Sequence, residues 1–449
     1  MSDSAPPRSV WSRSSKLFKL AAGLAQKEAA GRIARAFEKG EELAHRLHTA
    51  KVQVEQAREI VEHLGQLKGA AMKAGQLLSM ELRDVLPPEV VEILSKLQDS
   101  GNHVGFAEIR SILKDELGED LLGQLEIQEA PLASASIGQV HLAHWNRPDG
   151  TRETIVLKVQ FRGIADTIES DLAVLEKVAR LFLAMQLKDI EVGGAFDELK
   201  AVLVRETDYE AEADALERYR AKAADLPGVR VPRCFRELST KRVLALSFES
   251  GVKVDAFLST NPSREEREHF AHVFLDLYFR EFFDWGLVQT DANFANFLFR
   301  PSTRELVVLD FGATRDYPQA FRDDYRALIL SSYRRDEQAT YEAAVRLGLI
   351  DPTESEAARR ALMVLLESVL CIFRDEHQPY DFADRKHTDA AADALKAFYK
   401  TLKRGTAPAQ LIFLHRKLAG VHAMGKALGA KMDLRVYWRR LEGDERRAA

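Results

Sequence analysis

Between residues 41 and 100, apolar residues recur at three- and four-residue spacing, which predicts amphipathic helices. The spacing is clearest at six positions: Ile60, Leu64, Leu67, Ala71, Ala74 and Leu78. Pro87-Pro88 should end this run, and another helix is expected over about 89–97. A further helix is expected over about 106–117, where Gly118 stops it. A helical region is therefore expected directly after the first 40 residues.

After Pro131 the pattern changes from helical spacing to the alternation that is typical of strands. A run of small residues is followed by a β-like segment that reaches Ala143. Asp149-Gly150 is a common hairpin turn, and it precedes an apolar strand at 154–160. One charged residue, Lys158, lies inside that strand. This region therefore predicts a hairpin that carries a single lysine.

Helical spacing returns over about 164–187 and 196–219, and a short strand pair is predicted over about 229–248. Helices dominate the remainder of the chain. A polar turn and an apolar strand interrupt them at about 289–312, and helical spacing resumes at about 321–333.

The composition is that of an ordinary soluble protein with enough apolar residues to bury a core. The chain has 449 residues, of which 46% are hydrophobic and 30% charged. This length suits two or three domains, or one large two-lobed enzyme. The formal charge of −5 excludes a globally basic nucleic-acid binder, so no nucleic acid is expected as a partner. Two cysteines, Cys234 and Cys371, are too few for a disulfide framework or a cysteine metal cluster, which fits a reducing compartment.

No stretch approaches the roughly 20 apolar residues of a membrane span, and the N-terminus lacks the apolar core of a secretory signal. The first 15 residues are expected to be disordered, and a helix-like stretch with a basic edge begins at Lys16. Three interpretations of this basic segment are open: an anionic membrane surface contact, a solvated helix, or a transit peptide. The expected location is cytoplasmic, with peripheral membrane association through the basic segment.

The main candidate for chemistry is an aspartate followed five residues later by an asparagine, and then by a strand that ends in Asp-Phe-Gly. Asp291 and Asn296 form the first pair, and Asp310 begins the Asp-Phe-Gly triplet. In protein kinases these positions supply the catalytic base, a ligand to one Mg²⁺, and a ligand to the metal that bridges the ATP phosphates. The alternative is a polar turn before an ordinary strand. The spacing favours phosphoryl transfer if a phosphate-covering loop and a lysine lie upstream.

Both upstream parts have candidates. Small residues in the loop before the lysine strand would let backbone N–H groups approach phosphate oxygens: Ala133, Ser134, Ala135 and Ser136. An ammonium inside an apolar strand is costly unless it is paired, and a kinase uses such a lysine to grip the α- and β-phosphates. Lys158 is the candidate for that role. The alternatives are a plain turn and an edge-strand lysine whose ammonium reaches water.

An acidic cluster in the predicted helix at 196–219 offers partners for these groups. Glu212 is the candidate partner of Lys158, and Glu206 and Asp208 are candidates for positions nearer the metal. The alternative is a solvated acidic face, which is the commoner role of such clusters.

Taken in order, these motifs resemble those of the UbiB family of atypical protein-kinase-like proteins, which are associated with ubiquinone biosynthesis. The resemblance runs from about residue 58 to about residue 430. It rests on five ordered motifs and one late segment: Lys73-Ala74-Gly75-Gln76, Ala133 to His141, Glu206-Thr207-Asp208, Gln289 to Asn296, Leu309 to Arg315, and Leu414 to Gly420.

The resemblance implies an α+β, two-lobed protein-kinase-like fold with an N-terminal helical extension packed over the active site. Lys73 and Gln76 of that extension would approach the nucleotide and the acidic motif, as additional catalytic residues. The implied parts are a basic, partly disordered segment (1–40), a helical extension (41–130), a small sheet-containing N-lobe (131–250) and a helical C-lobe (251–449).

The resemblance also implies ATP and Mg²⁺ as cofactors, with ATP hydrolysis or phosphorylation of a small or lipid-like molecule in ubiquinone or related isoprenoid lipid metabolism. Enzymes of quinone biosynthesis are candidate partners. The alternative is a nucleotide-binding, chaperone-like pseudoenzyme that organises partner enzymes. A genuine protein kinase is disfavoured, because Gln289-Thr290 replaces the usual His-Arg and the helix at about 321 leaves little room for an activation segment. Many members of the family have membrane-spanning segments near one terminus. Since none is expected in this chain, any membrane role is expected to be peripheral.

Overall fold

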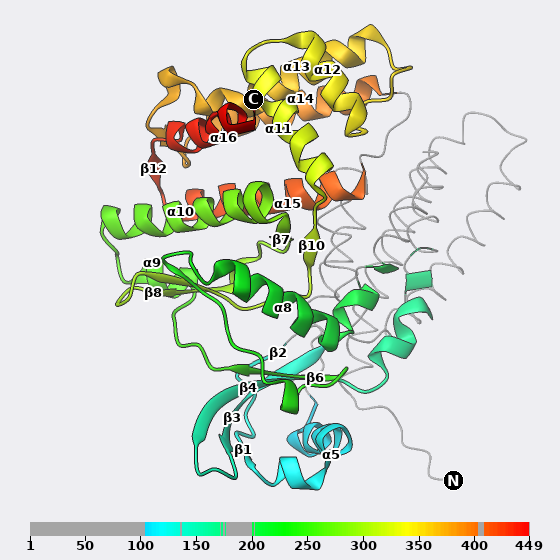
Figure 1. Ribbon diagram of the computed structural model, residues 1–449, viewed down its shortest axis with the longest axis vertical. Helices are drawn as coiled ribbons and strands as arrows, with labels where there is room; N and C mark the ends of the chain where they lie inside the picture. Colours follow the sequence, from blue (N-terminus) through cyan, green and yellow to red (C-terminus); the bar gives the residue numbers. More distant parts are fainter. Residues whose placement is uncertain are drawn as a thin grey trace, which may run out of the picture. The chain divides into compact units, whose positions relative to one another are not determined.

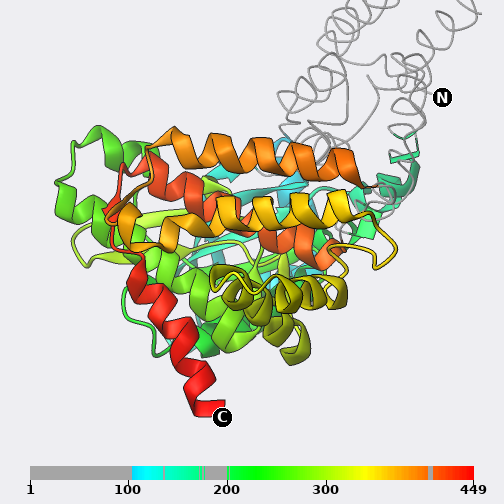
Figure 2. The ribbon, with the colours of Figure 1, turned by 90° about the horizontal axis from the view of Figure 1, so that it is seen from above.

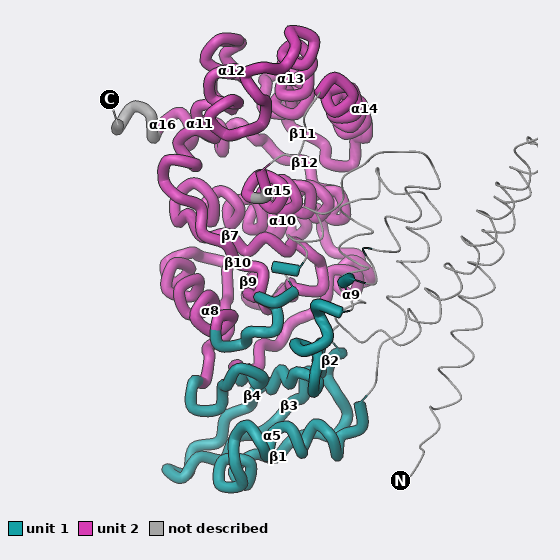
Figure 3. Tube along the Cα trace, turned by 90° about the vertical axis from the view of Figure 1, so that its right-hand side faces the viewer, with its two compact units in different colours: residues 1–210, 236–245 teal, residues 211–235, 246–449 magenta. Residues whose placement is uncertain are grey.

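The structure is a computed structural model that describes residues 104–134, 137–170, 172–173, 176, 200–201, 203–402 and 408–448. The helices predicted over 41–100 lie outside these residues. The chain divides into two compact units, which Figure 3 distinguishes by colour. The first unit comprises residues through 210 together with 236–245, and the second comprises 211–235 and 246–449. Lys158 therefore belongs to the first unit and Glu212 to the second.

The described part of the first unit is built on an antiparallel sheet and the helix α5 (Phe106–Leu122) (Figure 1). The hairpin predicted around Asp149-Gly150 is confirmed, because β3 and β4 pair along their whole length. The strand order is β1 (Leu125–Ile127), β3 (Gly138–Asn146), β4 (Arg152–Gln160), β6 (Val243–Ser247), and β2 (Ala133–Ser134) also pairs with β3.

Alternation along β4 decides which of its own side chains are buried. Ile155, Leu157 and Val159 are fully buried, whereas Lys158 between them is half-buried. Successive side chains of a strand point to opposite faces, so the lysine lies on the less buried face of the sheet. The helix stop predicted at Gly118 is confirmed as a break with φ of 78°, although helical structure continues to Leu122.

Helices dominate the second unit, and Figure 2 shows α13 and α14 running side by side. None of the described helices is long and apolar enough to cross a membrane. In chain order the helices are α8 (Tyr209–Ala223), α9 (Val254–Ser259), α10 (Arg264–Phe279), the π-helix η2 (Arg280–Trp285), α11 (Gln319–Tyr333), α12 (Glu337–Arg346), α13 (Glu356–Leu370), α14 (Arg385–Thr401), α15 (Ala409–Ala427) and α16 (Arg435–Ala448).

Three small sheets lie among these helices. The first has the order β5-β9-β8, and the other two are the antiparallel pairs β7–β10 and β11–β12. Their bounds are β5 (Val229–Arg230), β7 (Leu287–Gln289), β8 (Phe297–Arg300), β9 (Glu305–Val308), β10 (Thr314–Asp316), β11 (Tyr380–Asp381) and β12 (Lys431–Met432).

Two predictions about local structure are wrong. The strands expected to pair over 229–248 share an isolated bridge between Cys234 and Leu246, but they lie in different sheets, since β5 pairs in parallel with β9 and β6 joins the sheet of the first unit. The single helix expected over 196–219 is interrupted at Thr207 and Asp208. The Thr207 hydroxyl donates to the carbonyl of Val204 at 2.8 Å, and Gln160 donates to the Thr207 carbonyl at 3.1 Å. These bonds satisfy the backbone locally in place of a continuing helix.

An aromatic cluster supports the β8–β9 hairpin of the second unit. The rings of Phe270 and Phe299 stack with centroids 4.2 Å apart, and Phe257 meets both edge-on. All three side chains are almost fully buried. Buried aromatic side chains contribute large apolar areas with defined ring geometry. This cluster therefore fixes the hairpin that connects Asn296 to Asp310.

Candidate functional site

The strand register of the first unit places Lys158 beside the small-residue segment. Val140 of β3 pairs directly with Lys158 on one side and with Ala133 of β2 on the other. Directly opposed residues of antiparallel strands have side chains on the same face. Ala133, Val140 and Lys158 therefore form one row across three strands, with Ser134 next to the row. Backbone register alone brings the predicted lysine and half of the predicted loop together.

The acidic motif is attached to the end of the lysine strand. Gln160, two residues after Lys158, donates its side-chain amide to the Thr207 carbonyl, between Glu206 and Asp208. Tyr209 follows directly, and its buried ring centroid lies 5.0 Å from the Lys158 ammonium. This distance is within the range of a cation–π interaction. The first unit thus holds the predicted lysine and the predicted acidic motif side by side.

Gly138, which follows the small-residue segment and begins β3, has a packing role. A Cβ atom added there would lie 2.3 Å from the carbonyl oxygen of Val159. No side chain fits at that distance, so glycine is required for the close approach of β3 to β4. The sequence interpretation assigned small residues of this segment to phosphate contact. For Gly138 the approach of the strands already accounts for the residue.

In the second unit, the residues before Asp291 fix the loop that carries it. Gln289 ends β7 and pairs with Thr314 of β10. Thr290 donates to the carbonyl of Ala313 through both its backbone N–H, at 3.2 Å, and its hydroxyl, at 2.7 Å. Gln289 donates its side-chain amide to the Asp291 carbonyl at 2.8 Å. The Gln-Thr dipeptide thus ties the loop to the segment that follows Asp-Phe-Gly.

Asp291 and Asn296 are in direct contact. The Asn296 side-chain amide donates to Asp291 Oδ2 at 2.9 Å and to the Asp291 carbonyl at 3.1 Å. Between them, the Asn293 side chain accepts from the backbone N–H of Ala295 at 3.0 Å and shapes the turn. The Leu309 N–H donates to the Asn296 carbonyl at 2.9 Å, so Asp310 begins one residue beyond this contact. The spacing of these motifs therefore corresponds to proximity in space.

Glu212 lies beside the Asp-Phe-Gly triplet. The residue is 4% exposed, and its carboxylate accepts from the Phe311 N–H at 3.4 Å, while Asp310 Oδ1 accepts from the Gly312 N–H at 3.0 Å. A Cβ atom at Gly312 would lie 3.5 Å from Asp310 Oδ1 and 3.6 Å from Glu212 Oε2, so both carboxylates flank the same glycine. The helix that carries Glu212 is also held to β10, since Arg218 forms two 3.0 Å hydrogen bonds with Asp316.

Helix α15 contacts the Asp291 loop through two residues to which sequence reasoning gave no role. Arg416 donates to Asp291 Oδ1 at 2.8 Å, and both side chains are mostly buried. One turn further along, a Cβ atom at Gly420 would lie 2.2 Å from the Cβ of Ala292 and 3.2 Å from its carbonyl oxygen. Glycine at position 420 therefore allows the helix to approach the loop closely enough for Arg416 to reach Asp291.

A buried polar network lies behind the same loop. The Lys417 ammonium lies 2.9 Å from Glu281 Oε2 and 3.4 Å from Gln289 Oε1, and the exposed fractions of Lys417 and Glu281 are 1% and 0%. Tyr219 donates its hydroxyl to Glu281 Oε1 at 2.6 Å, and its ring meets Phe311 edge-on. Burial raises the pKa of the Glu281 carboxyl, and the Lys417 ammonium opposes that shift. The network therefore depends on pairing of two buried charges.

The donor set around Asn296 fits Mg²⁺. Hard divalent cations take carboxylate and amide oxygens as ligands. Since its amide nitrogen bonds to Asp291, Asn296 directs its Oδ1 away from that aspartate, and this oxygen accepts no hydrogen bond from any described residue. Asp310 supplies a half-buried carboxylate one residue beyond the Asn296–Leu309 backbone bond. Asn296 and Asp310 are therefore the residues that would hold the ion.

The predicted site residues fall into three groups. The first unit holds Ala133, Ser134, Lys158, Glu206 and Asp208, and the second holds Glu212, Asp291, Asn296 and Asp310. The pairing of Lys158 with Glu212 would join the two units and stays a prediction. Outside the described residues lie Lys73, Gln76, Ala135 and Ser136.

Arg416, Lys417 and Glu281 were missed as functional candidates although the sequence carries a signal for them. Lys417 and Glu281 lie in helical stretches rich in apolar residues, although each directly follows another charged residue, Arg416 and Arg280 respectively. A charge in such a stretch needs a partner. The two residues lie 136 positions apart, so the sequence offers no way to match them.

Comparison with known proteins accords with this geometry. The profile of the ABC1 atypical kinase-like domain matches residues 96–344. The chain belongs to the ABC1 family of atypical kinase-like proteins. This confirms the resemblance to UbiB proteins and the α+β, kinase-like fold. Membership implies ATP binding, usually with Mg²⁺.

Three relatives illustrate how this ABC1 chain compares with other members. It is 31% identical over 380 residues to "Atypical kinase COQ8, mitochondrial" of Saccharomyces cerevisiae, 33% over 390 to "Atypical kinase coq-8, mitochondrial" of Caenorhabditis elegans, and 30% over 385 to "Atypical kinase COQ8B, mitochondrial" of Danio rerio. These matches cover 83 or 84% of this chain, and 73%, 49% and 60% of the three relatives, respectively.

A solved structure shows the same fold. The complex of Rv3197 with erythromycin from Mycobacterium tuberculosis superposes with a TM-score of 0.59, and it is 24% identical in sequence. The likeness covers 88% of this chain and 97% of that one. At this identity the match bears on the fold alone.

Proposed function

We propose that this ABC1 protein binds Mg-ATP and either hydrolyses it or transfers its terminal phosphoryl group to a small or lipid-like molecule. The observation that carries the proposal is the contact of Asp291 with Asn296 at 2.9 Å, with Asp310 one residue beyond the Asn296–Leu309 backbone bond. Phosphoryl transfer needs a proton acceptor beside the oxygen ligands of the metal. The contact within the second unit supports the assignment of Asp291 as that acceptor and of Asn296 and Asp310 as those ligands.

Each residue has a defined part in the proposed reaction. Lys158 binds phosphate oxygens, and Asp310 and Asn296 hold Mg²⁺, which when bound neutralises phosphate charge. Asp291 orients the attacking water or hydroxyl and accepts its proton, because Asn296 and Arg416 fix both of its carboxylate oxygens. Glu212 is proposed to orient Lys158. Most of the rate acceleration comes from positioning and charge neutralisation.

The acceptor is proposed to be a small or lipid-like molecule of ubiquinone or related isoprenoid metabolism. The names of the relatives, which designate COQ8 atypical kinases, support this class. So does the short segment after Asp310, where β10 occupies 314–316 and α11 already begins at Gln319. A long activation segment, on which a protein kinase docks its peptide, has no room between these elements.

A second candidate is a nucleotide-binding, chaperone-like pseudoenzyme. The observation that favours it is the ion pair between Arg416 and Asp291, because a carboxylate engaged at 2.8 Å by a guanidinium has less capacity to accept a proton. In this alternative, Arg416 holds Asp291 as a structural ligand of the loop. Mg-ATP would then change the affinity for partner enzymes without turnover.

ATP turnover distinguishes the two candidates. Phosphate release and phosphoryl transfer are measured with Mg-ATP, vesicles that contain anionic phospholipid, and a prenylated phenol. We expect turnover that Asp291→Asn lowers by about 100-fold or more, since a general base contributes about 10²–10⁴. The matched control is Asp389→Asn, an exposed aspartate of α14, which should retain wild-type turnover. Absence of turnover in wild type under every condition would favour the pseudoenzyme.

A further inference from the structure

Three metal-ligating side chains converge at the connection between α13 and α14, among residues that the proposed phosphoryl transfer does not use. They are Cys371, directly after α13, His377 in the connection, and His387 in the first turn of α14. One ligand atom from each lies within 4.8 Å of the other two, and all three side chains are half-buried. Within the described residues, this is a cluster of one thiol and two imidazoles.

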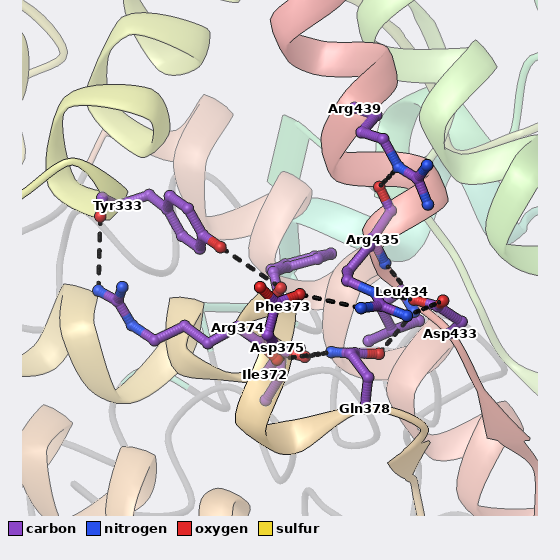
Figure 4. A network of polar contacts seen from close by, with 10 residues as sticks. All are labelled: Tyr333, Ile372, Phe373, Arg374, Asp375, Gln378, Asp433, Leu434, Arg435 and Arg439. Atoms are coloured by element: carbon purple, nitrogen blue, oxygen red, sulfur yellow. Dashed lines mark hydrogen bonds and ion pairs between the residues drawn. The ribbon is translucent and has the colours of Figure 1, made fainter.

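A polar network fixes the backbone that carries two of these ligands (Figure 4). Gln378 donates to the carbonyl of Ile372 at 2.6 Å and accepts from the N–H of Leu434 at 2.8 Å. Asp375 accepts from Arg435 of α16 at 3.0 Å. Ile372 adjoins Cys371 and Gln378 adjoins His377, so both ligands project from a segment that is anchored on two sides. Pre-positioned ligands are what a metal site requires of its surroundings.

The histidines are arranged as two ligands of one ion would be. Their ring centroids lie 4.5 Å apart with the planes at 74°. The Nδ1 of His387 is buried and has no hydrogen-bond partner among the described residues. A buried ring nitrogen without a partner is costly, and coordination of a cation would satisfy it. Asp384 fixes the start of α14 by accepting from the Lys386 N–H at 2.9 Å, next to His387.

We propose that Cys371, His377 and His387 bind a divalent transition-metal ion, with Zn²⁺ as the expected occupant. A thiolate with two imidazoles selects Zn²⁺ over Mg²⁺, which prefers oxygen ligands, so this site does not compete with the oxygen ligands at Asp310. Tetrahedral zinc with its usual bond lengths places S and N ligand atoms about 3.3–3.6 Å apart. The three ligand atoms lie within 4.8 Å of one another. Side-chain rotations that move each of these atoms by about 1 Å would bring them to the zinc separation. Three protein ligands leave a fourth position for water.

The site acts as a clamp on the α13–α14 connection. The ligands come from the end of one helix, the connection itself and the start of the next helix, so one ion ties the three segments together. Metal that binds the folded chain and not the unfolded chain stabilises the fold by mass action. Zn²⁺ should therefore raise the melting temperature of the protein independently of ATP.

Cobalt(II) absorption tests the site in the full chain, purified without a histidine tag. Tetrahedral Co²⁺ with a thiolate ligand gives ligand-field bands in the visible and a sulfur-to-metal charge-transfer band in the near ultraviolet. We expect both, at one equivalent of Co²⁺ and with Mg²⁺ in excess, and we expect Zn²⁺ to abolish them. Cys371→Ser should remove the charge-transfer band, and His387→Gln should weaken Co²⁺ binding by more than about 100-fold, since loss of even an outer partner costs about 10–100-fold.

Two matched variants serve as controls. Cys234→Ser replaces the other cysteine. His422→Gln replaces a histidine outside the cluster whose ring lies against Tyr380, as the His387 ring also does. Both should keep the cobalt spectrum. A spectrum that Cys234→Ser abolishes, or a wild-type protein with no charge-transfer band, would overturn the proposal. If Cys371→Ser does not fold, His377→Gln supplies the same comparison, and an unchanged cobalt affinity in that variant also overturns it.

Discussion

The two units position their charged candidate residues differently. In the first unit, Lys158 is half-buried and is placed by register with Val140 of the neighbouring strand. In the second unit, charged residues from distant parts of the chain support the Asp291 loop. Arg416 is 125 positions from Asp291, and Lys417 is 136 positions from Glu281. The position of Lys158 therefore depends on local strand geometry, whereas that of the Asp291 loop depends on tertiary packing of α15.

The largest expected effect comes from breaking the buried ion pair. Lys417→Met leaves the Glu281 carboxylate buried and uncompensated, so the free energy of unfolding should fall by about 3–5 kcal/mol. Chemical denaturation measures this loss. The double variant Lys417→Met/Glu281→Gln removes both charges and should recover much of it. Equal losses in the single and double variants would show that packing, and not charge pairing, supports the loop.

The next largest effect is expected where α15 approaches the Asp291 loop closely, at a position that carries no charge. Gly420→Ala introduces a Cβ atom at 2.2 Å from the Ala292 Cβ, so α15 and the Asp291 loop must move apart. We expect ATP turnover to fall by about 100-fold, the effect of a displacement of about 1 Å at a catalytic group. Gly443→Ala in α16 is the control, because a Cβ atom there meets nothing within 4 Å and should stabilise the helix by about 0.5–1 kcal/mol. Wild-type turnover in Gly420→Ala would contradict the role given to α15.

A smaller effect is expected at Arg416. Arg416→Gln removes the ion pair with Asp291 but leaves Asn296 and Asp310 in place. Turnover should therefore fall about tenfold, which corresponds to a rise of roughly 1.4 kcal/mol in the barrier, with little change in Mg-ATP affinity. Arg416→Lys should restore part of the rate. Steady-state kinetics separate kcat from KM for ATP. An increase in turnover would instead identify the pair as a restraint on Asp291.

The smallest effect on stability is expected in the first unit. Lys158 is half-buried, so Lys158→Met should change the free energy of unfolding by no more than about 0.5 kcal/mol. ATP affinity should nevertheless fall by at least about tenfold, because the phosphate contact is lost. Denaturation and ATP titration of the same variant measure both quantities. A loss of stability as large as that of Lys417→Met would remove the difference between the two units.

The sequence predicted the parts of the fold and site that depend on local pattern. Alternation predicted β4 and Lys158, and motif spacing selected Asp291, Asn296 and Asp310. The Asn296 side-chain amide bonds to Asp291, and a backbone bond from Leu309 to Asn296 brings Asp310 near this contact. The interruption of the helix at Thr207 could not be predicted, because the Gln160 amide that bonds to its carbonyl comes from a strand 47 positions away. For the same reason, the pairing of β5 with β9 depends on a contact that helical and strand periodicity do not encode.

The contacts made by α15 could not be predicted from the sequence either. The segment Leu414 to Gly420 was noticed only as part of a family resemblance. Its physical role follows from two facts that exist only in three dimensions, the 2.8 Å contact of Arg416 with Asp291 and the close approach of Gly420 to Ala292.

The most direct test of the account is the melting temperature of the chain with and without Mg-ATP, for wild type and for Asp310→Asn. Binding at about 100 times Kd adds about 2.7 kcal/mol to the folded state. We predict that Mg-ATP raises the wild-type melting temperature, that ATP with EDTA does so far less, and that Asp310→Asn shows no increase with Mg-ATP. An Asp310→Asn variant that gains as much as wild type would contradict the assignment of Asp310 as a metal ligand, and with it the proposed phosphoryl-transfer centre.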